Sequence, residues 1–317
     1  MQKLVTGIDI GGTNVSYGLV TQDGAVKLKE SFPIKEFKEV SHFVDYLSQR
    51  IIHSVDGLKD YQLEGIGIGA PNGNYYNGTI EFAPNLPWKG VIPLAELLSK
   101  KTNLPAKLTN DANAATVGEM IYGNAKGLKD FVMITLGTGL GSGFVANGKL
   151  ILGHDGFAGE LGHAIFDPNG RQCNCGRKGC LETYASASGI VRTVKEMLTS
   201  SGKPSSLRNL STEEISSEKI YRAAIENDPL ALEAFDYTGY VLGIMLANAV
   251  TITSPEAIFL FGGLANAGDL IFKPVKKYME EYLLPIFKNK IELKPSALPE
   301  NDAAILGAAA LFWETKH

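Results

Sequence analysis

Two segments of the chain share one pattern, in which an apolar strand leads into a glycine-threonine turn and then a second strand. The turn of the first copy, between strands at residues 4–10 and 15–20, consists of Gly11, Gly12, Thr13 and Asn14. The turn of the second copy, after a strand at 131–136, begins with Gly137, Thr138 and Gly139. Such turns expose backbone N–H groups that can bind phosphate oxygens. The repeat predicts two similar α/β domains that face each other, with a nucleotide between their hairpins.

Asp9 stands just before the first turn, at the end of a predicted buried strand. Its carboxylate could hold Mg²⁺, directly or through water, beside the phosphates that the turn binds. No helix follows the glycines, which excludes the Rossmann and P-loop types of phosphate site. Because glycine turns are common, a plain hairpin turn is the alternative for each copy taken alone.

All three cysteines of the chain, Cys173, Cys175 and Cys180, follow closely after His163. Three thiols and one imidazole form a Cys3His set, which suits closed, four-coordinate Zn²⁺. Residues 166–179 are too polar to order themselves by apolar burial. The alternatives are cysteines buried as small apolar residues and a disulfide, but no apolar face is at hand and the Cys173–Cys175 spacing is too short for an easy bridge. We therefore predict a zinc-bound loop.

This zinc segment resembles the signature of the ROK family, which contains sugar kinases and related repressors. The matching residues are Glu160-Leu-Gly-His163 and Cys-x-Cys-Gly-x-x-Gly-Cys-x-Glu182. The resemblance extends to the two glycine turns, an Asn-Asp pair near residue 110 and a Gly-Gly turn near 262. It implies an actin-like (ribonuclease H-like) ATPase fold, with two α/β domains around a central cleft. The smaller domain would be residues 1–112, completed by a C-terminal helix at 303–317, and the larger one residues 113–302.

The resemblance also implies roles for single residues. Asp111 is the expected general base and Asn110 a sugar ligand. The residues expected to hold other sugar hydroxyls are Asn85, Glu160, His163 and Glu182. His163 would use one ring nitrogen for zinc and the other for the sugar. The pair Gly262-Gly263 resembles the adenosine motif of the family. Local sequence alone would make Asp111 only an N-cap and the two glutamates solvated side chains.

The implied activity is transfer of the γ-phosphoryl group of ATP to the 6-hydroxyl of a hexose. Glucose is the expected hexose, although the chain departs from the glucose kinases of the family. Those often have Pro-Gly and Asn-Leu-Pro-Gly-Trp where this chain has Pro71-Asn72 and Asn85-Leu-Pro-Trp88-Lys. A kinase for N-acetylmannosamine or N-acetylglucosamine is therefore an alternative.

A sugar-sensing regulatory protein without kinase turnover is the alternative from another class. Repressors of the family carry a helix-turn-helix segment before the first glycine turn. We expect none here, because the first strand begins by Leu4. A sugar-binding module without turnover would be expected to lack a phosphate turn or the base, and both are present.

Charge and hydropathy exclude some partners. A net charge of −4 over 317 residues gives no electrostatic case for nucleic acid or an anionic membrane. No stretch is expected to reach the apolar length of a membrane-spanning helix, and the N-terminus does not resemble a signal peptide. Since the cysteines are expected to be reduced, the predicted compartment is the cytoplasm. A homodimer is expected from the resemblance alone.

Apolar periodicity predicts most of the remaining elements. Helices are expected at residues 182–199, 229–251 and 270–286, of which the second is long and buried. A core strand is expected at 257–261. The small-residue-rich helix that begins at Ala303 should return to pack on the N-terminal domain.

Overall fold

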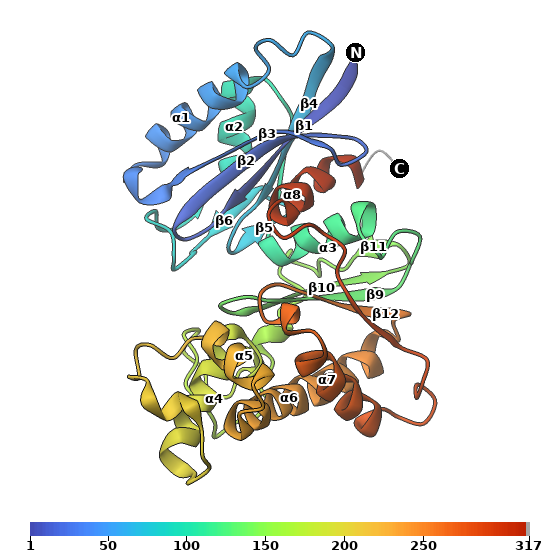
Figure 1. Cartoon of the computed structure of the whole chain (residues 1–317). Coiled ribbons are helices and arrows are strands. Elements are labelled where there is room, and N and C mark those ends of the chain that lie inside the picture. The colour runs from blue at the N-terminus through green and yellow to red at the C-terminus, as the bar shows by residue number, and fades with distance from the viewer. Residues whose placement is uncertain (315–317) are drawn as a thin grey trace.

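The computed structural model describes residues 1–314, and within this range two five-stranded sheets are surrounded by helices (Figure 1). The first sheet has the order β3-β2-β1-β4-β8. Its strands are β1 (Gln2–Ile10), β2 (Asn14–Thr21), β3 (Val26–Pro33), β4 (Tyr61–Gly69) and β8 (Ala106–Thr109). β1, β4 and β8 are parallel, whereas β2 and β3 add to the sheet as antiparallel hairpins.

The second sheet repeats this topology with the order β11-β10-β9-β12-β13. Its strands are β9 (Phe131–Leu136), β10 (Leu140–Ala146), β11 (Lys149–Leu150), β12 (Ala257–Phe261) and β13 (Glu292–Pro295). Here too the first strand in the chain is central, pairs antiparallel with the second and parallel with the fourth. The predicted repeat is therefore confirmed as two sheets of one topology.

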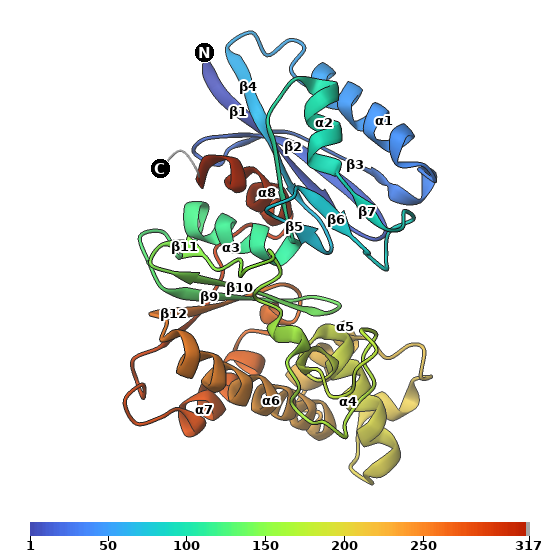
Figure 2. The same ribbon diagram turned by 180° about the vertical axis from the view of Figure 1, so that it is seen from behind.

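Two helices separate the sheets, α3 (Asp111–Tyr122) and α8 (Ala303–Glu314) (Figures 1 and 2). Their backbones touch, since a Cβ on Gly118 of α3 would lie 2.8 Å from the Cα of Gly307 of α8. α8 also lies directly on the first sheet, where a Cβ on Gly67 would lie 1.8 Å from the carbonyl oxygen of Ala308. The expectation that the last helix packs back on the N-terminal part of the chain is confirmed.

The other faces of the sheets are covered by the remaining helices. α1 (Val40–His53) and α2 (Leu94–Thr102) pack on the first sheet. The second sheet is covered by α4 (Ala187–Ser200), α5 (Ser217–Ile225), α6 (Pro229–Thr253) and α7 (Asp269–Tyr282). Short 3-10 helices lie in the loops: η1 (Ile34–Glu36), η2 (Leu161–His163), η3 (Leu181–Thr183), η4 (Ser206–Asn209) and η5 (Ala265–Ala267).

The prediction that no stretch reaches the apolar length of a membrane-spanning helix was wrong for α6. Among the described residues, this helix alone is long and apolar enough to cross a membrane by length and composition. However, 67% of its most apolar window is buried inside the protein, against α7 and the second sheet. The core helix of a globular protein passes the same test of length and hydropathy, because it is apolar on most sides.

Other boundaries differ from the predictions for local reasons. The helix expected from residue 182 begins at Ala187, where the Ser186 side chain caps it. The helix expected to reach residue 286 ends at Tyr282, since Pro285 disfavours helical backbone in the residue before it. β3 was not predicted because it is half exposed and rich in charge. A small sheet within the described range was also missed, because its strands are too short for a pattern: β5 (Gly73–Asn74), β6 (Thr79–Glu81) and β7 (Val91–Ile92).

The contact between α3 and α8 makes a testable prediction. In Gly307→Ala the new Cβ would lie 2.6 Å from the carbonyl oxygen of Ala114. Overpacking of this kind should lower the free energy of unfolding by about 1–3 kcal/mol, although alanine favours helix by about 1 kcal/mol. Gly202→Ala, where a Cβ would meet no atom within 4 Å, is the control for denaturant unfolding. Equal stability of the two variants would contradict the prediction.

Candidate active site

A cavity of about 590 Å³ opens where the carboxyl ends of the parallel strands of both sheets meet. Strand ends of this kind are the usual ligand sites of α/β folds. Most residues predicted from sequence line it: Asp9, Gly11, Gly12, Asn85, Asn110, Asp111, Gly137, Thr138, Gly139, Glu160, His163, Glu182 and Gly262. Thr13, Asn14 and Gly263 were also predicted, but they are not among the lining residues.

The first hairpin turn joins β1 to β2 and lies against the loop of Asn85, one of the predicted sugar ligands. Gly11 donates its N–H to the Asn14 carbonyl oxygen at 2.9 Å, which closes the turn. A Cβ on Gly12 would lie 3.0 Å from the Cβ of Asn85. Because this glycine has no side chain, the turn and the Asn85 loop can touch.

Asp9 is the last residue but one of β1, beside this turn, and it lines the cavity together with a second carboxylate, that of Asp111. Burial, and then repulsion from Asp111, raise the pKa of Asp9 to about 6. A cation between the two groups would remove both penalties, because it replaces lost hydration and screens the repulsion. Oxygen ligands of this kind are what Mg²⁺ prefers, so Asp9 fits the predicted role in holding that ion.

Asp111 is placed by the start of α3. Asn110 is the N-cap, and its side chain accepts a hydrogen bond of 2.6 Å from the Asn113 N–H. The simpler local interpretation of Asp111 as the cap is therefore wrong, since Asp111 is the first helical residue. Its Oδ1 accepts the Ala112 N–H at 2.9 Å, and its carboxylate lies at the cavity. Asp111 is open to the cavity, but the surrounding walls remove part of its hydration, and this desolvation raises the pKa of Asp111.

Glu182 brings the sugar side and the second hairpin together. Its Oε2 lies 3.4 Å from the N–H of Leu140, the residue that ends the turn between β9 and β10. A Cβ on Gly139 would lie 2.6 Å from the same oxygen. The glycine therefore leaves room for the carboxylate against the turn.

Glu160 is held by a residue that sequence analysis missed. The buried Ser142 hydroxyl donates to the Gly159 carbonyl oxygen and accepts the Leu161 N–H at 3.1 Å. Ser142 therefore fixes the backbone of the residues just before and just after Glu160. A serine inside a strand of glycine and apolar residues was the available signal. Burial raises the pKa of Glu160, and the nearby His163 opposes this.

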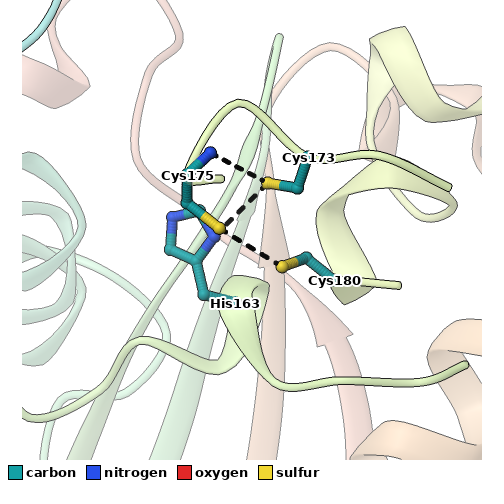
Figure 3. Close-up of side chains that lie close together, drawn as sticks. All are labelled: His163, Cys173, Cys175 and Cys180. Atoms are coloured by element: carbon teal, nitrogen blue, oxygen red, sulfur yellow. Dashed lines mark hydrogen bonds between the residues drawn. The ribbon is translucent and has the colours of Figure 1, made fainter. Parts of the chain in front are cut away.

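The predicted zinc ligands converge from two separate loops (Figure 3). The ligand atoms of His163, Cys173, Cys175 and Cys180 all lie within 4.8 Å of one another. Cys175 Sγ is 3.5 Å from Cys180 Sγ, and Cys173 Sγ is 3.8 Å from His163 Nδ1. Tetrahedral Zn²⁺ with Zn–S bonds of about 2.3 Å sets its ligand atoms about 3.8 Å apart. The four residues therefore fit such an ion.

Arg177 borders this cluster and favours the thiolate form of Cys175. Burial raises the pKa of Cys175, but hydrogen bonds with the backbone and side chain of Arg177 outweigh burial and lower the pKa to about 6. The Arg177 side chain also donates to the His163 carbonyl oxygen at 2.9 Å. Since metals bind the thiolate, this surrounding suits a metal ligand.

The sequence model of the ROK family matches residues 5–315. The chain belongs to the ROK family. A relative, the glucokinase of Thermotoga maritima, is 36% identical over 327 residues, and the match covers 99% of each chain. The xylose repressor of Bacillus spizizenii is 31% identical over 97% of this chain and 76% of the repressor. The two relatives show that ROK proteins similar to this chain include both a kinase and a regulator.

Among solved structures, a ROK family glucokinase from Streptomyces griseus, in complex with glucose and AMPPNP, is similar over the whole fold. Its TM-score is 0.80 at 31% identity, with 97% of this chain and 98% of that chain covered. This ROK protein therefore has the mixed α/β architecture of the family's sugar kinases.

The electrostatics of Asp9 predict how stability depends on pH. Its pKa is raised from an ordinary value near 4 to about 6. The stability that goes with its neutral form is therefore present below pH 4 and is lost as the pH rises through 6. In magnesium-free buffer, Asp9→Asn should raise the melting temperature at pH 7.5 and change it little at pH 4. Asp60→Asn, at an exposed site, is the control for lost charge. A lower melting temperature of Asp9→Asn at pH 7.5 would contradict the assignment.

Proposed function

We propose that this ROK protein is an ATP-dependent sugar kinase that phosphorylates the 6-hydroxyl of a hexose, with glucose as the substrate. One observation carries the proposal. Asp111 shares a single cavity with two glycine hairpins and with three polar residues, Glu160, His163 and Glu182. A base, two anion-binding turns and a polar pocket are the parts that phosphoryl transfer to an alcohol requires.

Asp111 acts as the general base. Its carboxylate at the cavity accepts the proton of the attacking hydroxyl as the new P–O bond forms. A raised pKa suits this role, because a slightly more basic carboxylate takes the proton more readily. Asn110 uses its Oδ1 to cap α3, and its side chain also hydrogen-bonds Glu160, so one Nδ2–H would remain to donate to a sugar oxygen.

The two turns bind the phosphates of ATP from opposite sides. Gly11 and Gly12 approach from the first sheet, and Gly137 to Gly139 approach from the second. Mg²⁺ held by Asp9 would supply positive charge that offsets the phosphates. Gly262 follows β12 at the cavity and would lie beside the nucleoside part of ATP. Its φ of 101° and the Leu136 backbone packed against it require a glycine there.

The Cys3His residues would hold a zinc ion that orders the sugar pocket and takes no part in transfer. Its ligands would be His163, Cys173, Cys175 and Cys180, and it would supply a cross-link between loops. Glu182 Oε1 lies 3.2 Å from Cys173 Sγ, so the sugar pocket and the metal loop are adjacent. His163 turns Nδ1 toward the thiols, which leaves Nε2 for the sugar.

We propose that the two sheets mark two domains that close around the substrates. One domain consists of residues 1–112 with the helix predicted at 303–317, of which 315–317 lie outside the described residues. The other consists of residues 113–302. Closure would exclude water that competes with the sugar as phosphoryl acceptor.

We further propose that the enzyme acts in the cytoplasm, as a homodimer and without nucleic acid or membrane partners. The reduced thiols support the compartment. The net charge of −4 supports the absence of anionic partners. Sedimentation at several concentrations would measure the assembly.

A sugar-sensing regulator is the second candidate. The similarity to a xylose repressor favours it, and a fold alone does not decide function. The proposed base distinguishes the two, because a sensor needs the sugar pocket but has no use for proton abstraction at Asp111.

The first test is phosphorylation by ATP across glucose, mannose, fructose, N-acetylglucosamine and N-acetylmannosamine. Glucose should react fastest, and Asp111→Asn should lower kcat about 10²- to 10⁴-fold while the variant still binds glucose in calorimetry. Preference for an N-acetyl sugar would leave the kinase proposal standing with a different substrate. Absence of turnover with every sugar would favour the regulator.

Removal of the metal is the second test. Incubation with a zinc chelator should release one equivalent of Zn²⁺, lower the melting temperature and raise the KM for glucose more than the KM for ATP. The reason is that one of the four ligands, His163, is itself a proposed sugar residue, and a second ligand, Cys173, lies beside Glu182. Cys175→Ser should reproduce these effects. Metal-free protein with an unchanged KM for glucose would show that zinc does not order the pocket.

A further inference from the structure

The second phosphate turn is supported from behind by the start of α4. The Ser188 hydroxyl donates a hydrogen bond of 2.7 Å to the carbonyl oxygen of Thr138. The N–H of Ala187 donates one of 2.9 Å to the carbonyl oxygen of Gly137. Two successive carbonyl groups of the turn therefore face α4.

These two bonds determine where the amides of the turn point. In a planar trans peptide the C=O and the following N–H point in opposite directions. With the carbonyl groups of Gly137 and Thr138 directed at α4, the N–H groups of Thr138 and Gly139 point away from the helix. Both residues line the cavity, so these donors are available to an anion inside it.

The start of α4 is itself firmly held. The fully buried Ser186 donates to the Glu182 carbonyl oxygen at 2.7 Å and accepts the Gly189 N–H at 3.0 Å. Arg171 of the metal loop donates to the Thr183 carbonyl oxygen at 2.6 Å. The segment 182–188 therefore connects the metal loop and the sugar pocket to the phosphate turn without a flexible link.

We propose that Ser188 is a positioning residue for nucleotide binding, which aims the N–H of Gly139 at a phosphate group of the nucleotide. The inference rests on the proposed function in one respect, that the cavity binds ATP. Ser188 does not line the cavity and acts only through the carbonyl group that it holds. No pattern in the sequence singled it out, because a serine near a helix start is ordinarily a capping residue.

Calorimetric titration with AMPPNP and Mg²⁺ tests the inference, because binding of this analogue needs no turnover. Ser188→Ala removes the bond to Thr138 and a 3.1 Å contact with the Ser186 hydroxyl, and it should weaken AMPPNP binding about three- to ten-fold. Ser188→Thr keeps the hydroxyl and should bind within about two-fold of wild type. Ser200→Ala is the matched control, since Ser200 ends the same helix and, among the described residues, its hydroxyl bonds only to the Glu196 carbonyl oxygen.

Steady-state kinetics supply the second measurement. In Ser188→Ala the KM for ATP should rise by the same factor as the Kd for AMPPNP, while the KM for glucose, the zinc content and the melting temperature stay at wild-type values. Equal increases in both KM values would indicate a general structural defect and overturn the inference. Equal losses in the Ala and Thr variants, or wild-type affinity in Ser188→Ala, would also overturn it.

The wild-type protein separates this inference from the proposed function. If it binds AMPPNP but phosphorylates no sugar, the kinase proposal fails, while the Kd values of the variants still decide the role of Ser188. If it binds no nucleotide at all, the role of Ser188 fails as well.

Discussion

The close contact between α3 and α8 sets the relation between the two halves of the protein. Gly118 and Gly307 let the helix backbones meet, and glycines of β1 and β4 let α8 lie directly on the first sheet. A side chain at either helix position would separate the layers. Because α3 also carries Asp111 at its first turn, the same contact positions the proposed base between the two hairpins.

The cavity that results is electrostatically unfavourable without ligands. Asp9, Asp111 and Glu160 all have raised pKa values, and burial is the first cause in each case. Carboxylates that lie close together and are partly removed from water lower the stability of the folded protein, and such an arrangement is common at functional sites. A cation at Asp9 and hydroxyl donors at Glu160 and Asp111 would relieve it. This electrostatic penalty therefore favours binding of the proposed substrates over the empty state of the cavity.

The loop with the proposed metal ligands is connected to the second phosphate turn through neighbouring side chains. Arg171 and Cys173 lie on the loop, Glu182 lies between the loop and the turn, and Ser188 lies behind the turn. Contacts with backbone or carboxylate groups join the loop to Glu182 and join Glu182 and Ser188 to the turn. Ordering the loop with zinc would therefore steady the sugar pocket and, through segment 182–188, the amides that face the nucleotide.

The sequence by itself indicated the repeated hairpin, the four candidate metal ligands and the resemblance to the ROK family, because each depends on short motifs whose residues are close together in the chain. It could not show that Asn110 rather than Asp111 caps α3, that Ser142 steadies Glu160, or that Ser188 holds the Thr138 carbonyl group. The last two facts depend on tertiary structure. A hydrogen bond between residues 50 positions apart leaves no periodic pattern, and its geometry exists only once the sheets and helices have packed.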